Sequence, residues 1–294
     1  MRTANLIVSA GLLLVVGCHP RGRMDYTELD SSSEGRTLPY GVYLPPGWDG
    51  QTPLPLVILL HGAGDDATSA DRRVVTKALD ASIEAGDVPP FLMVMPEGEL
   101  GFWVNWHDES HHWKDWVLEE VVPDVQRRYP VVEGPQGLHV MGVSMGGAGA
   151  MQMWLSEPAR FGSATVLSAP ILNEADTRKF LARFMPPSII LGVFGPPGSD
   201  AGVDPYVEMT GPDALQGSQL TLGVATREKG PMGKWSEAYH QELAGRKVPH
   251  RFIQFRGGHN WRTWAKVFPF ALCHQLQSDC SMTAPSSWGV SETD

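Results

Sequence analysis

The sequence predicts a three-layer α/β domain around a mostly parallel β-sheet. Three short apolar runs are typical of strands buried on both faces: PLVILL at 55–60, FLMVMP at 91–96 and GLHVMGV at 137–143. Helical patterns separate or follow these runs, as in residues 113–129 and 235–245. Because strands that alternate with helices pair in parallel and are covered on both faces, this order favours a three-layer domain.

The remaining elements extend the same pattern. Residues 36–50 indicate an edge strand that ends in a Pro-Pro-Gly turn, and further strands are expected within 161–170, 220–230 and 250–260. The chain has 294 residues, of which 42% are hydrophobic, enough for one large domain. Its net charge of -10 argues against nucleic acid as a partner, since nucleic acid requires basic patches.

The N-terminus has the pattern of an export signal. A short apolar run leads to Gly17 and Cys18, and Val-Val-Gly-Cys at 15–18 resembles the lipobox of bacterial lipoproteins. We therefore expect a signal peptide over 1–17 and lipidation of Cys18. The protein would then be exported to the bacterial cell envelope and anchored in a membrane on its periplasmic or outer surface.

Three further segments follow from composition. Residues 18–35 are polar and are expected to form a tether, 36–280 the folded domain, and 281–294 a loose C-terminal tail. After export, Cys273 and Cys280 are expected to form a disulfide, with two free thiols as the alternative.

The sequence GVSMG at 142–146 matches the G-x-S-x-G pattern of a nucleophile elbow around Ser144. The pattern alone is common, but here a predicted strand over 137–143 runs directly into a predicted helix over 146–155, as an elbow requires. Gly142 and Gly146 allow the sharp turn, because side chains there would collide. Ser144 is therefore the candidate nucleophile.

A nucleophilic serine also needs backbone donors for an oxyanion. The N–H of Met145, at the start of the helix, is the first candidate. The loop His-Gly-Ala-Gly at 61–64, which follows an earlier strand, is expected to provide the second. We assign this role to the N–H of Ala63, with Gly62 as the alternative, and expect a structural role for His61.

The base and the acid should follow the serine in the order acid, then histidine. His259 lies just past a predicted strand on a Gly-Gly loop, where its ring can reach the edge of the sheet. The acid should follow the preceding strand, which makes Glu228 the first candidate. Asp204, Asp200 and Glu237 remain open as alternatives.

Aromatic residues lie near the expected site. Trp106 and Trp261, on loops, are candidates for walls that bind a substrate. His107 and His111 have helical spacing, but no further ligand set accompanies them, so the polar start of a helix is favoured over a zinc site. No metal and no cofactor is expected.

Five segments together resemble a known family, the esterase D-like esterases. They are residues 38–48, 55–66, 116–130, 139–169 and 255–264, and the resemblance covers most of residues 36–276. This family includes formylglutathione hydrolases, feruloyl and other carbohydrate esterases, and mycolyltransferases. The resemblance implies an α/β-hydrolase fold with a mostly parallel central sheet, a Ser-acid-His triad and no cofactor.

The resemblance carries Ser144, His259, Met145 and Ala63 over to their family roles. At the acid the chain departs from the family pattern, because relatives often have an Asp after a Gly-Thr pair where this chain reads GVATREKG. Residues 189–209 also look longer than the family pattern and are expected to shape the pocket.

These inferences predict an exported serine esterase that hydrolyses carboxylic esters through an acyl-enzyme. Its substrate would be a small-molecule or polysaccharide-linked ester, and its other partner a membrane surface reached through the lipid anchor. Two alternatives stay open: an acyltransferase that uses the same acyl-enzyme, and a non-catalytic binding lipoprotein with the same fold.

Overall fold

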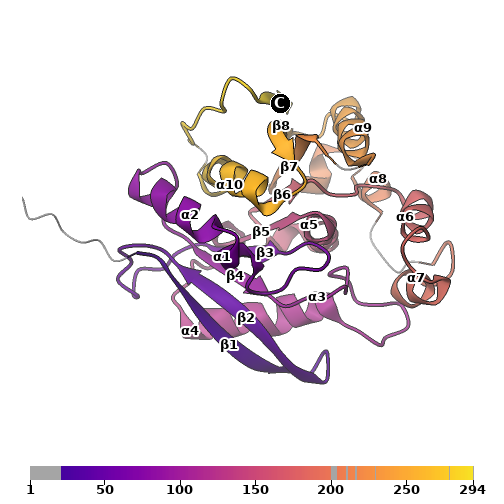
Figure 1. Cartoon of the computed structure of the whole chain (residues 1–294), viewed down its shortest axis with the longest axis horizontal. Helices are drawn as coiled ribbons and strands as arrows, with labels where there is room; N and C mark the ends of the chain where they lie inside the picture. Colours follow the sequence, from indigo (N-terminus) through magenta and orange to yellow (C-terminus); the bar gives the residue numbers. More distant parts are fainter. Residues whose placement is uncertain are drawn as a thin grey trace, which may run out of the picture.

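A computed structural model of the chain describes residues 21–199, 204–209, 211–215, 217–228, 230–277 and 279–293. Within these residues, nine strands form one sheet in the order β1-β2-β4-β3-β5-β6-β7-β8-β9 (Figure 1). The pairs from β4 to β8 are parallel, whereas β1, β2 and β9 pair antiparallel at the two edges. The strands are β1 (Arg23–Ser31), β2 (Arg36–Leu44), β3 (Leu56–Leu60), β4 (Leu92–Pro96), β5 (Leu138–Val143), β6 (Ser163–Leu167), β7 (Gln219–Arg227), β8 (His250–Gly258) and β9 (Gly289–Thr293).

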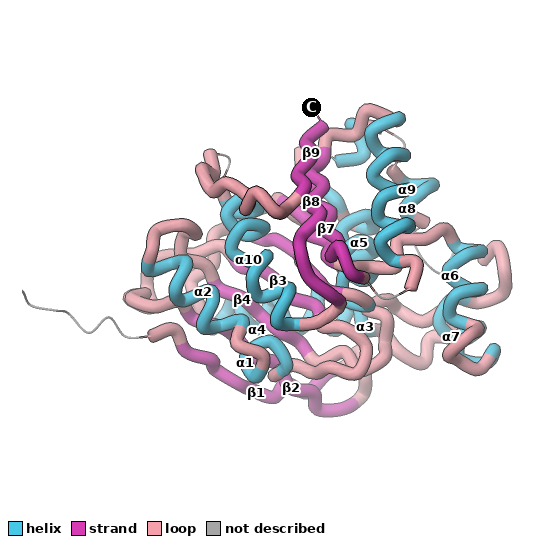
Figure 2. The backbone as a smooth tube through the Cα atoms, turned by 45° about the horizontal axis from the view of Figure 1, so that its top comes forward, coloured by secondary structure: helices cyan, strands magenta, loops and turns pink. Residues whose placement is uncertain are grey.

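Helices cover both faces of this sheet (Figure 2). The helices are α1 (Ser69–Arg72), α2 (Val75–Glu84), α3 (Trp113–Asp115), α4 (Val122–Arg128), α5 (Met145–Ser156), α6 (Glu174–Leu181), α7 (Pro187–Phe194), α8 (Pro205–Glu208), α9 (Met232–Gly245) and α10 (Trp261–Leu276). Apolar residues of α2 and α10 join one core, and those of α3, α4, α5 and α9 join the other. In both views α6 and α7 lie together beyond the edge of the sheet.

The two cores follow from the alternation of side chains along each strand. In β3, Leu56 and Ile58 contribute to one core while Val57 and Leu59 contribute to the other, and every residue of the strand is buried. The predicted three-layer architecture with a mostly parallel sheet is therefore confirmed.

The helix expected over 113–129 is interrupted in the middle. After α3 comes a π-helical segment, η1 (Trp116–Val121), and α4 begins only at Val122. Pro123 follows shortly after the π-helical segment, within a continuous helical stretch, where it has no backbone N–H to donate to the preceding turn. The remaining short segments are 3₁₀ turns, η2 (Pro135–Gly137), η3 (Pro158–Arg160) and η4 (Pro212–Leu215).

The prediction of a tether over 18–35 is wrong from residue 23 onwards. Residues 23–31 form β1, which pairs antiparallel with β2 along its whole length, from Arg23 opposite Leu44 to Ser31 opposite Arg36. An edge strand is held by backbone hydrogen bonds, which do not depend on the identity of its side chains. Because one of its faces is solvated, its sequence contains few apolar residues from which a strand could be predicted. Residues 1–20, which comprise the predicted signal over 1–17 and the predicted lipidation site Cys18, lie outside the described residues.

The prediction of a loose tail over 281–294 is also wrong in part. Residues 289–293 form β9, which pairs antiparallel with β8. Trp288 packs against Phe255 and Phe270, at centroid distances of 6.1 and 5.9 Å. The expected disulfide between Cys273 and Cys280 is present and joins the last turn of α10 to the segment that follows it.

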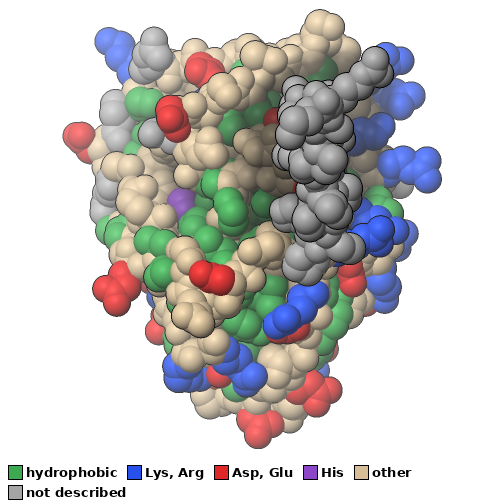
Figure 3. All heavy atoms as spheres, turned by 90° about the vertical axis from the view of Figure 1, so that its left-hand side faces the viewer, with side chains coloured by type: hydrophobic (Ala, Val, Ile, Leu, Met, Phe, Trp, Pro, Cys, Tyr) green, Lys and Arg blue, Asp and Glu red, His purple; other side chains and the backbone are tan. Residues whose placement is uncertain are grey.

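Charged side chains of both signs are spread over the face shown in Figure 3, with hydrophobic side chains between them. Among the described residues, no helix combines the length and apolar character needed to cross a membrane.

A buried histidine lies at the amino ends of β5 and β6. His139 is 3% exposed; its Nδ1 lies 2.7 Å from Ser163 Oγ and its Nε2 3.1 Å from the Gln136 carbonyl oxygen. Because a carbonyl can only accept, Nε2 carries the proton and Nδ1 accepts from the serine hydroxyl. Burial lowers the pKa of His139 to about 4, and the carbonyl contact offsets this only in part.

This burial predicts a pH-dependent stability. In the unfolded protein His139 is protonated below about pH 6.5, whereas in the folded protein it is protonated only near pH 4. The free energy of unfolding is therefore about 2 kcal/mol lower at pH 5 than at pH 7. His139→Asn, whose amide does not titrate, should lack this part of the decline. Urea unfolding of both proteins at pH 7 and pH 5 measures it, and equal declines in the two would contradict the assignment.

Candidate active site

The predicted site residues all follow the carboxyl ends of parallel strands. Ser144 follows β5, His259 follows β8, and Glu228 follows β7, while the loop that begins at His61 follows β3. Carboxyl ends of parallel strands meet at one edge of a sheet, which is where α/β proteins bind ligands. The structure brings the side chains of Ser144, His259 and Glu228 into one hydrogen-bonded chain.

Ser144 occupies a strained turn between β5 and α5. Its backbone angles are φ 58° and ψ -122°, a conformation that non-glycine residues adopt at a cost of about 1–3 kcal/mol. The Ser144 N–H donates to the Leu167 carbonyl oxygen at 2.9 Å, which ties the turn to the end of β6.

Two glycines make this turn possible, as the sequence predicts. A Cβ on Gly142 would lie 2.0 Å from the Gly146 carbonyl oxygen, and a Cβ on Gly146 would lie 2.0 Å from the Leu60 carbonyl oxygen. Both neighbours are backbone atoms and cannot move aside as a side chain would. Any side chain at either position would therefore displace Ser144.

His259 connects the serine to the acid. Its Nε2 lies 2.9 Å from Ser144 Oγ, and its Nδ1 lies 2.7 Å from Glu228 Oε2. Since an ionised carboxylate only accepts, Nδ1 carries the proton and Nε2 is free to accept the proton of the serine hydroxyl. This is the tautomer that a general base next to Ser144 requires.

Glu228 is held on both carboxylate oxygens. Oε1 accepts hydrogen bonds from Ser168 Oγ at 2.5 Å and from the Ala225 N–H at 2.9 Å, while Oε2 faces His259. Burial by itself raises the pKa of the Glu228 carboxyl, but the hydrogen bonds from His259, Ser168 and Ala225 outweigh it, so the pKa lies below its ordinary value. The side chain is therefore ionised at neutral pH.

The rival acids lie elsewhere. Asp204 caps α8 by accepting from the Tyr206 N–H and also accepts from the Glu174 N–H. Glu237 lies on α9 and binds the side-chain amides of Gln241 and Gln254. Asp200 is outside the described residues.

Two residues of the site escaped the sequence analysis. Ser168, which follows β6 with φ 52°, donates to Glu228 and accepts from Trp264 Nε1 at 3.0 Å. Trp264 is buried in the core, and its ring also stands edge-on to His259 with centroids 5.0 Å apart. The only signal for Ser168 in the sequence is its place directly after a predicted strand.

The loop after β3 is shaped to offer a backbone donor beside Ser144. The Gly62 carbonyl oxygen accepts from His61 Nδ1 at 2.9 Å and from the Asp65 N–H at 3.2 Å. A trans peptide directs the following N–H opposite to this carbonyl, so the Ala63 N–H points away from these two partners. Ala63 lines both of the cavities that meet at Ser144.

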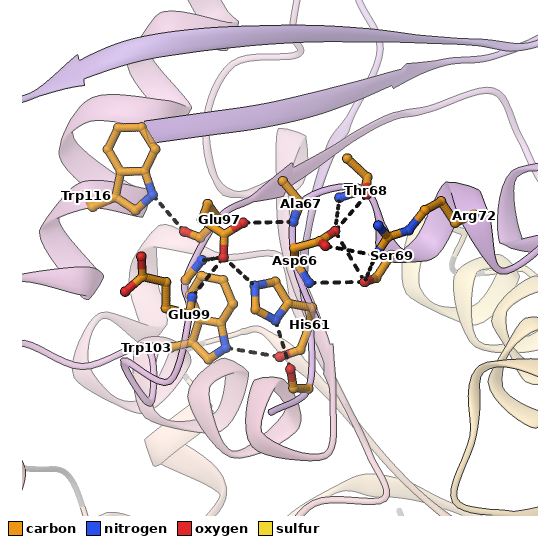
Figure 4. A network of polar contacts seen from close by, with 12 residues as sticks. His61, Asp66, Ala67, Thr68, Ser69, Arg72, Glu97, Glu99, Trp103 and Trp116 are labelled. Atoms are coloured by element: carbon orange, nitrogen blue, oxygen red, sulfur yellow. Dashed lines mark hydrogen bonds and ion pairs between the residues drawn. The ribbon is translucent and has the colours of Figure 1, made fainter. Parts of the chain in front are cut away.

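A buried network holds this loop in place (Figure 4). Glu97, at the end of β4, accepts from the N–H groups of Ala67 and Glu99, and its Oε1 lies 3.6 Å from His61 Nε2. Trp103 Nε1 donates to the His61 carbonyl oxygen at 3.2 Å, and the two rings meet edge to face. His61 therefore has the structural role that the sequence predicts.

Two cavities meet at Ser144. The first, which we call the apolar pocket, has a volume of about 280 Å³ and includes Phe102, Ala148, Phe180, Phe184 and Phe194 in its wall. Residues 189–209 contribute to this wall as expected, through Phe194 and Pro205. Phe102 lies in the loop after β4, and its φ of 58° is an unusual backbone conformation for a residue other than glycine.

The second cavity, which we call the arginine pocket, has a volume of about 600 Å³. Its wall includes Arg72, Arg73, Arg262, Asp65 and Trp261. Trp261 Nε1 donates to Asp65 Oδ2 at 3.0 Å, so the predicted place of Trp261 in a pocket wall agrees with the structure.

Trp106 lines neither of these two pockets, so its predicted contact with a substrate stays a prediction without support from them. The Trp106 backbone N–H donates to the His111 carbonyl oxygen, its indole N–H donates to the Gly101 carbonyl oxygen, and its ring meets that of His111 edge to face. The loop folds back on itself through an antiparallel bridge between Asn105 and His112. The expected helical start at His107 is likewise not observed, because the helix begins at Trp113.

The described residues contain no group of three His, Cys, Asp or Glu side chains that could hold a metal ion.

A sequence model of the family described as "Putative esterase" matches residues 31–274. Esterase Rv1288 of Mycobacterium tuberculosis (strain ATCC 25618 / H37Rv) is 26% identical over 266 residues, which cover 82% of this chain and 56% of that protein. The chain thus spans about half the length of the curated relatives it matches.

Two solved structures show the same fold. FphF of Staphylococcus aureus, a fluorophosphonate-binding serine hydrolase, has a TM-score of 0.72 at 20% identity and covers 88% of this chain and 100% of its own. The ferulic acid esterase AmCE1/Fae1A of Anaeromyces mucronatus has a TM-score of 0.65 at 15% identity, with 88% and 93% covered. The expected α/β-hydrolase fold is confirmed.

The close approach at Gly146 gives a testable prediction. Gly146→Ala places a methyl group against the Leu60 carbonyl oxygen, so we expect a loss of about 1–3 kcal/mol in the free energy of unfolding and a displaced Ser144. Chemical denaturation measures the first effect, and the rate of Ser144 labelling by a fluorophosphonate measures the second. Gly233→Ala, a position with open space around it, is the matched control.

Proposed function

The chain belongs to this esterase family, and on that basis we propose that it is a serine carboxylesterase that works through an acyl-enzyme. The observation that carries the proposal is the hydrogen-bonded chain from Glu228 through His259 to Ser144, which ends at the junction of two cavities. A serine that is both activated in this way and open to a substrate is the arrangement that acyl transfer needs.

In the proposed first step, His259 Nε2 takes the proton of Ser144 Oγ while this oxygen attacks the ester carbonyl carbon. The negative charge that forms on the carbonyl oxygen is held by the N–H groups of Met145 and Ala63, each such donor being worth about 10²–10³ in rate. Met145 is the first residue of α5, where N–H groups have no partner within the helix. His259 then protonates the leaving alcohol.

In the second step, water replaces the alcohol. His259 takes a proton from the water as its oxygen attacks the acyl carbon, and then returns this proton to Ser144 as the acid departs. Glu228 stays ionised throughout and keeps the ring of His259 in its productive tautomer and orientation. Ser168 and Trp264 act as positioning residues, because they fix the carboxylate and the ring without touching the substrate.

The apolar pocket is the natural place for the acyl group. It begins at Ser144 and Met145, and the rest of its wall is almost entirely apolar. Phe180 packs edge-on against Phe184, so aromatic rings form one side of the pocket. A bulky apolar acyl group fits this wall better than a formyl or acetyl group, since each buried methylene adds about 0.8 kcal/mol.

We also propose that the protein is exported and anchored through a lipid on Cys18. The support comes from the signal-like N-terminal sequence and from the disulfide between Cys273 and Cys280, since disulfides persist in oxidising compartments. In that setting, small-molecule or polysaccharide-linked esters are the proposed substrates. Mass spectrometry of the detergent-extracted protein, beside Cys18→Ser, tests the anchor.

The catalytic roles predict the effects of three substitutions. Ser144→Ala should abolish hydrolysis of p-nitrophenyl butyrate, and Glu228→Gln should lower kcat by about 10³–10⁴-fold because His259 loses its orienting charge. Ser168→Ala should lower kcat about tenfold with little change in KM, since it removes one hydrogen bond to that charge. Steady-state kinetics measures all three, and Asp204→Ala is the matched carboxylate control.

The outcomes separate the candidate functions. Folded Ser144→Ala protein that keeps full turnover would overturn the proposal. Wild-type protein that is labelled by a fluorophosphonate at Ser144 but turns over no ester in water would favour an acyltransferase. Absence of both labelling and turnover would favour a non-catalytic binding protein.

The apolar pocket predicts a preference for longer acyl groups. We expect kcat/KM to rise about fourfold per methylene from acetate to butyrate to hexanoate. Ala148→Phe, which fills the pocket, should remove this rise, whereas Ala238→Phe on the exposed side of α9 should keep it. A flat or falling series in the wild type would show that the acyl group lies elsewhere.

A further inference from the structure

The arginine pocket concentrates positive charge beside Ser144. Arg72, Arg73 and Arg262 all contribute to its wall, although the whole chain carries a net charge of -10. These residues come from two separate places in the sequence, the connection between α1 and α2 and the first turn of α10. The fold therefore brings together cations that the sequence keeps almost 190 residues apart.

Two of these guanidinium groups have no partner of their own. Arg72 pairs with Asp66 at 2.8 Å, but no hydrogen bond or ion pair joins the side chain of Arg73 or Arg262 to any other described residue. The one carboxylate in the pocket wall, Asp65, already accepts from Trp261 Nε1. With Arg72 paired to Asp66, the charges of Arg73 and Arg262 exceed the single charge of Asp65 and leave the pocket with a surplus of positive charge.

One residue in this part of the wall has a strained backbone conformation. Val74, which follows Arg73 and also lines the pocket, has φ 65° and is 49% exposed. A β-branched residue is a clear outlier in this conformation, and neither burial nor a turn glycine explains it. Such strain is characteristic of segments that serve a ligand site.

We propose that the arginine pocket binds an anionic group on the alcohol portion of the ester, a carboxylate or a phosphate. The inference rests on the proposed esterase function and extends it to the leaving group. Guanidinium groups bind planar or tetrahedral oxyanions through paired N–H donors, which suits both chemistries. Arg73 and Arg262 would face this anion from opposite connections, while Arg72 stays bound to Asp66.

The two pockets also define which half of the ester lies where. An anion in the apolar pocket would lose its hydration without gaining a charged partner, which is unfavourable. An apolar acyl group in the arginine pocket would in turn cover two unpaired cations. With the scissile carbonyl at Ser144, the acyl group therefore lies in the apolar pocket and the anionic alcohol in the arginine pocket.

The test compares butyrate esters whose phenol leaving groups differ in charge. 3-Hydroxybenzoate carries a carboxylate, 3-hydroxyphenyl phosphate carries a phosphate, and 3-hydroxybenzamide is the neutral control. We expect kcat/KM to be about tenfold higher for an anionic ester than for the neutral one. This ratio corresponds to two exposed ion pairs, one with Arg73 and one with Arg262. The better of the two anionic esters identifies the anion.

Substitution of the two arginines locates the effect. In the double variant Arg73→Ala with Arg262→Ala, the ratio of kcat/KM for anionic over neutral esters should fall to about one. The matched control is Lys77→Ala with Lys266→Ala, which removes the same charge from α2 and α10 but touches neither pocket, and it should keep the preference. Raising the ionic strength from about 0.05 to 0.5 M should also weaken the preference.

The results distinguish this inference from the esterase function itself. Hydrolysis of the neutral ester that depends on Ser144, without any preference for anionic esters, would overturn the inference and leave the esterase function intact. A preference that survives in the arginine double variant would also overturn it. Failure of all three esters together with failure of fluorophosphonate labelling would instead overturn the esterase function.

Discussion

The contact between the first turn of α5 and the end of β3 is the constraint on which the site depends. Gly146 lies so close to the Leu60 carbonyl oxygen that any larger residue would push the helix away from the sheet. Because α5 cannot move, Ser144 is held at φ 58° between β5 and α5, where its hydroxyl reaches His259. The strain is local and is offset by the buried helix and strands on either side, as is common where a reactive group must be held in place.

A second set of interactions orients the partners of the serine. The hydrogen-bonded chain passes through residues at the carboxyl ends of four neighbouring strands: Ser144 after β5, Ser168 after β6, Glu228 after β7 and His259 after β8. A buried carboxylate would ordinarily resist ionisation, but three hydrogen bonds keep the pKa of Glu228 low. The parallel sheet thus supplies both the spacing of these groups and the backbone donors that keep the acid charged.

The surroundings of the hydrogen-bonded residues Ser144, His259 and Glu228 differ in polarity on their two sides. On one side, α6 and α7 and the loop after β4 form an apolar wall, with Arg178 holding the end of α7 through the carbonyl oxygens of Phe194 and Gly195. On the other side, the connection between α1 and α2 and the start of α10 carry cations. A single ester that spans Ser144 would meet both environments, so its two halves have different chemical requirements. Under the proposed function, selectivity would then arise from segments outside the hydrogen-bonded chain of Ser144, His259 and Glu228.

The sequence by itself determined the layered fold, the sharp turn at Ser144 and the choice of His259 as its partner, because each depends on a local pattern: apolar runs, small residues at a sharp turn, and a histidine after a strand. It narrowed the acid to a few candidates, and only the tertiary structure placed Glu228 against His259, since strand order is not written in local composition. The tertiary structure alone also placed Ser168 against Glu228 and the indole of Trp106 against Gly101. It alone revealed the edge strands β1 and β9, whose backbone pairing needs no apolar signal. The meeting of Arg73 with Arg262 likewise depends on how distant segments pack, which no local pattern records.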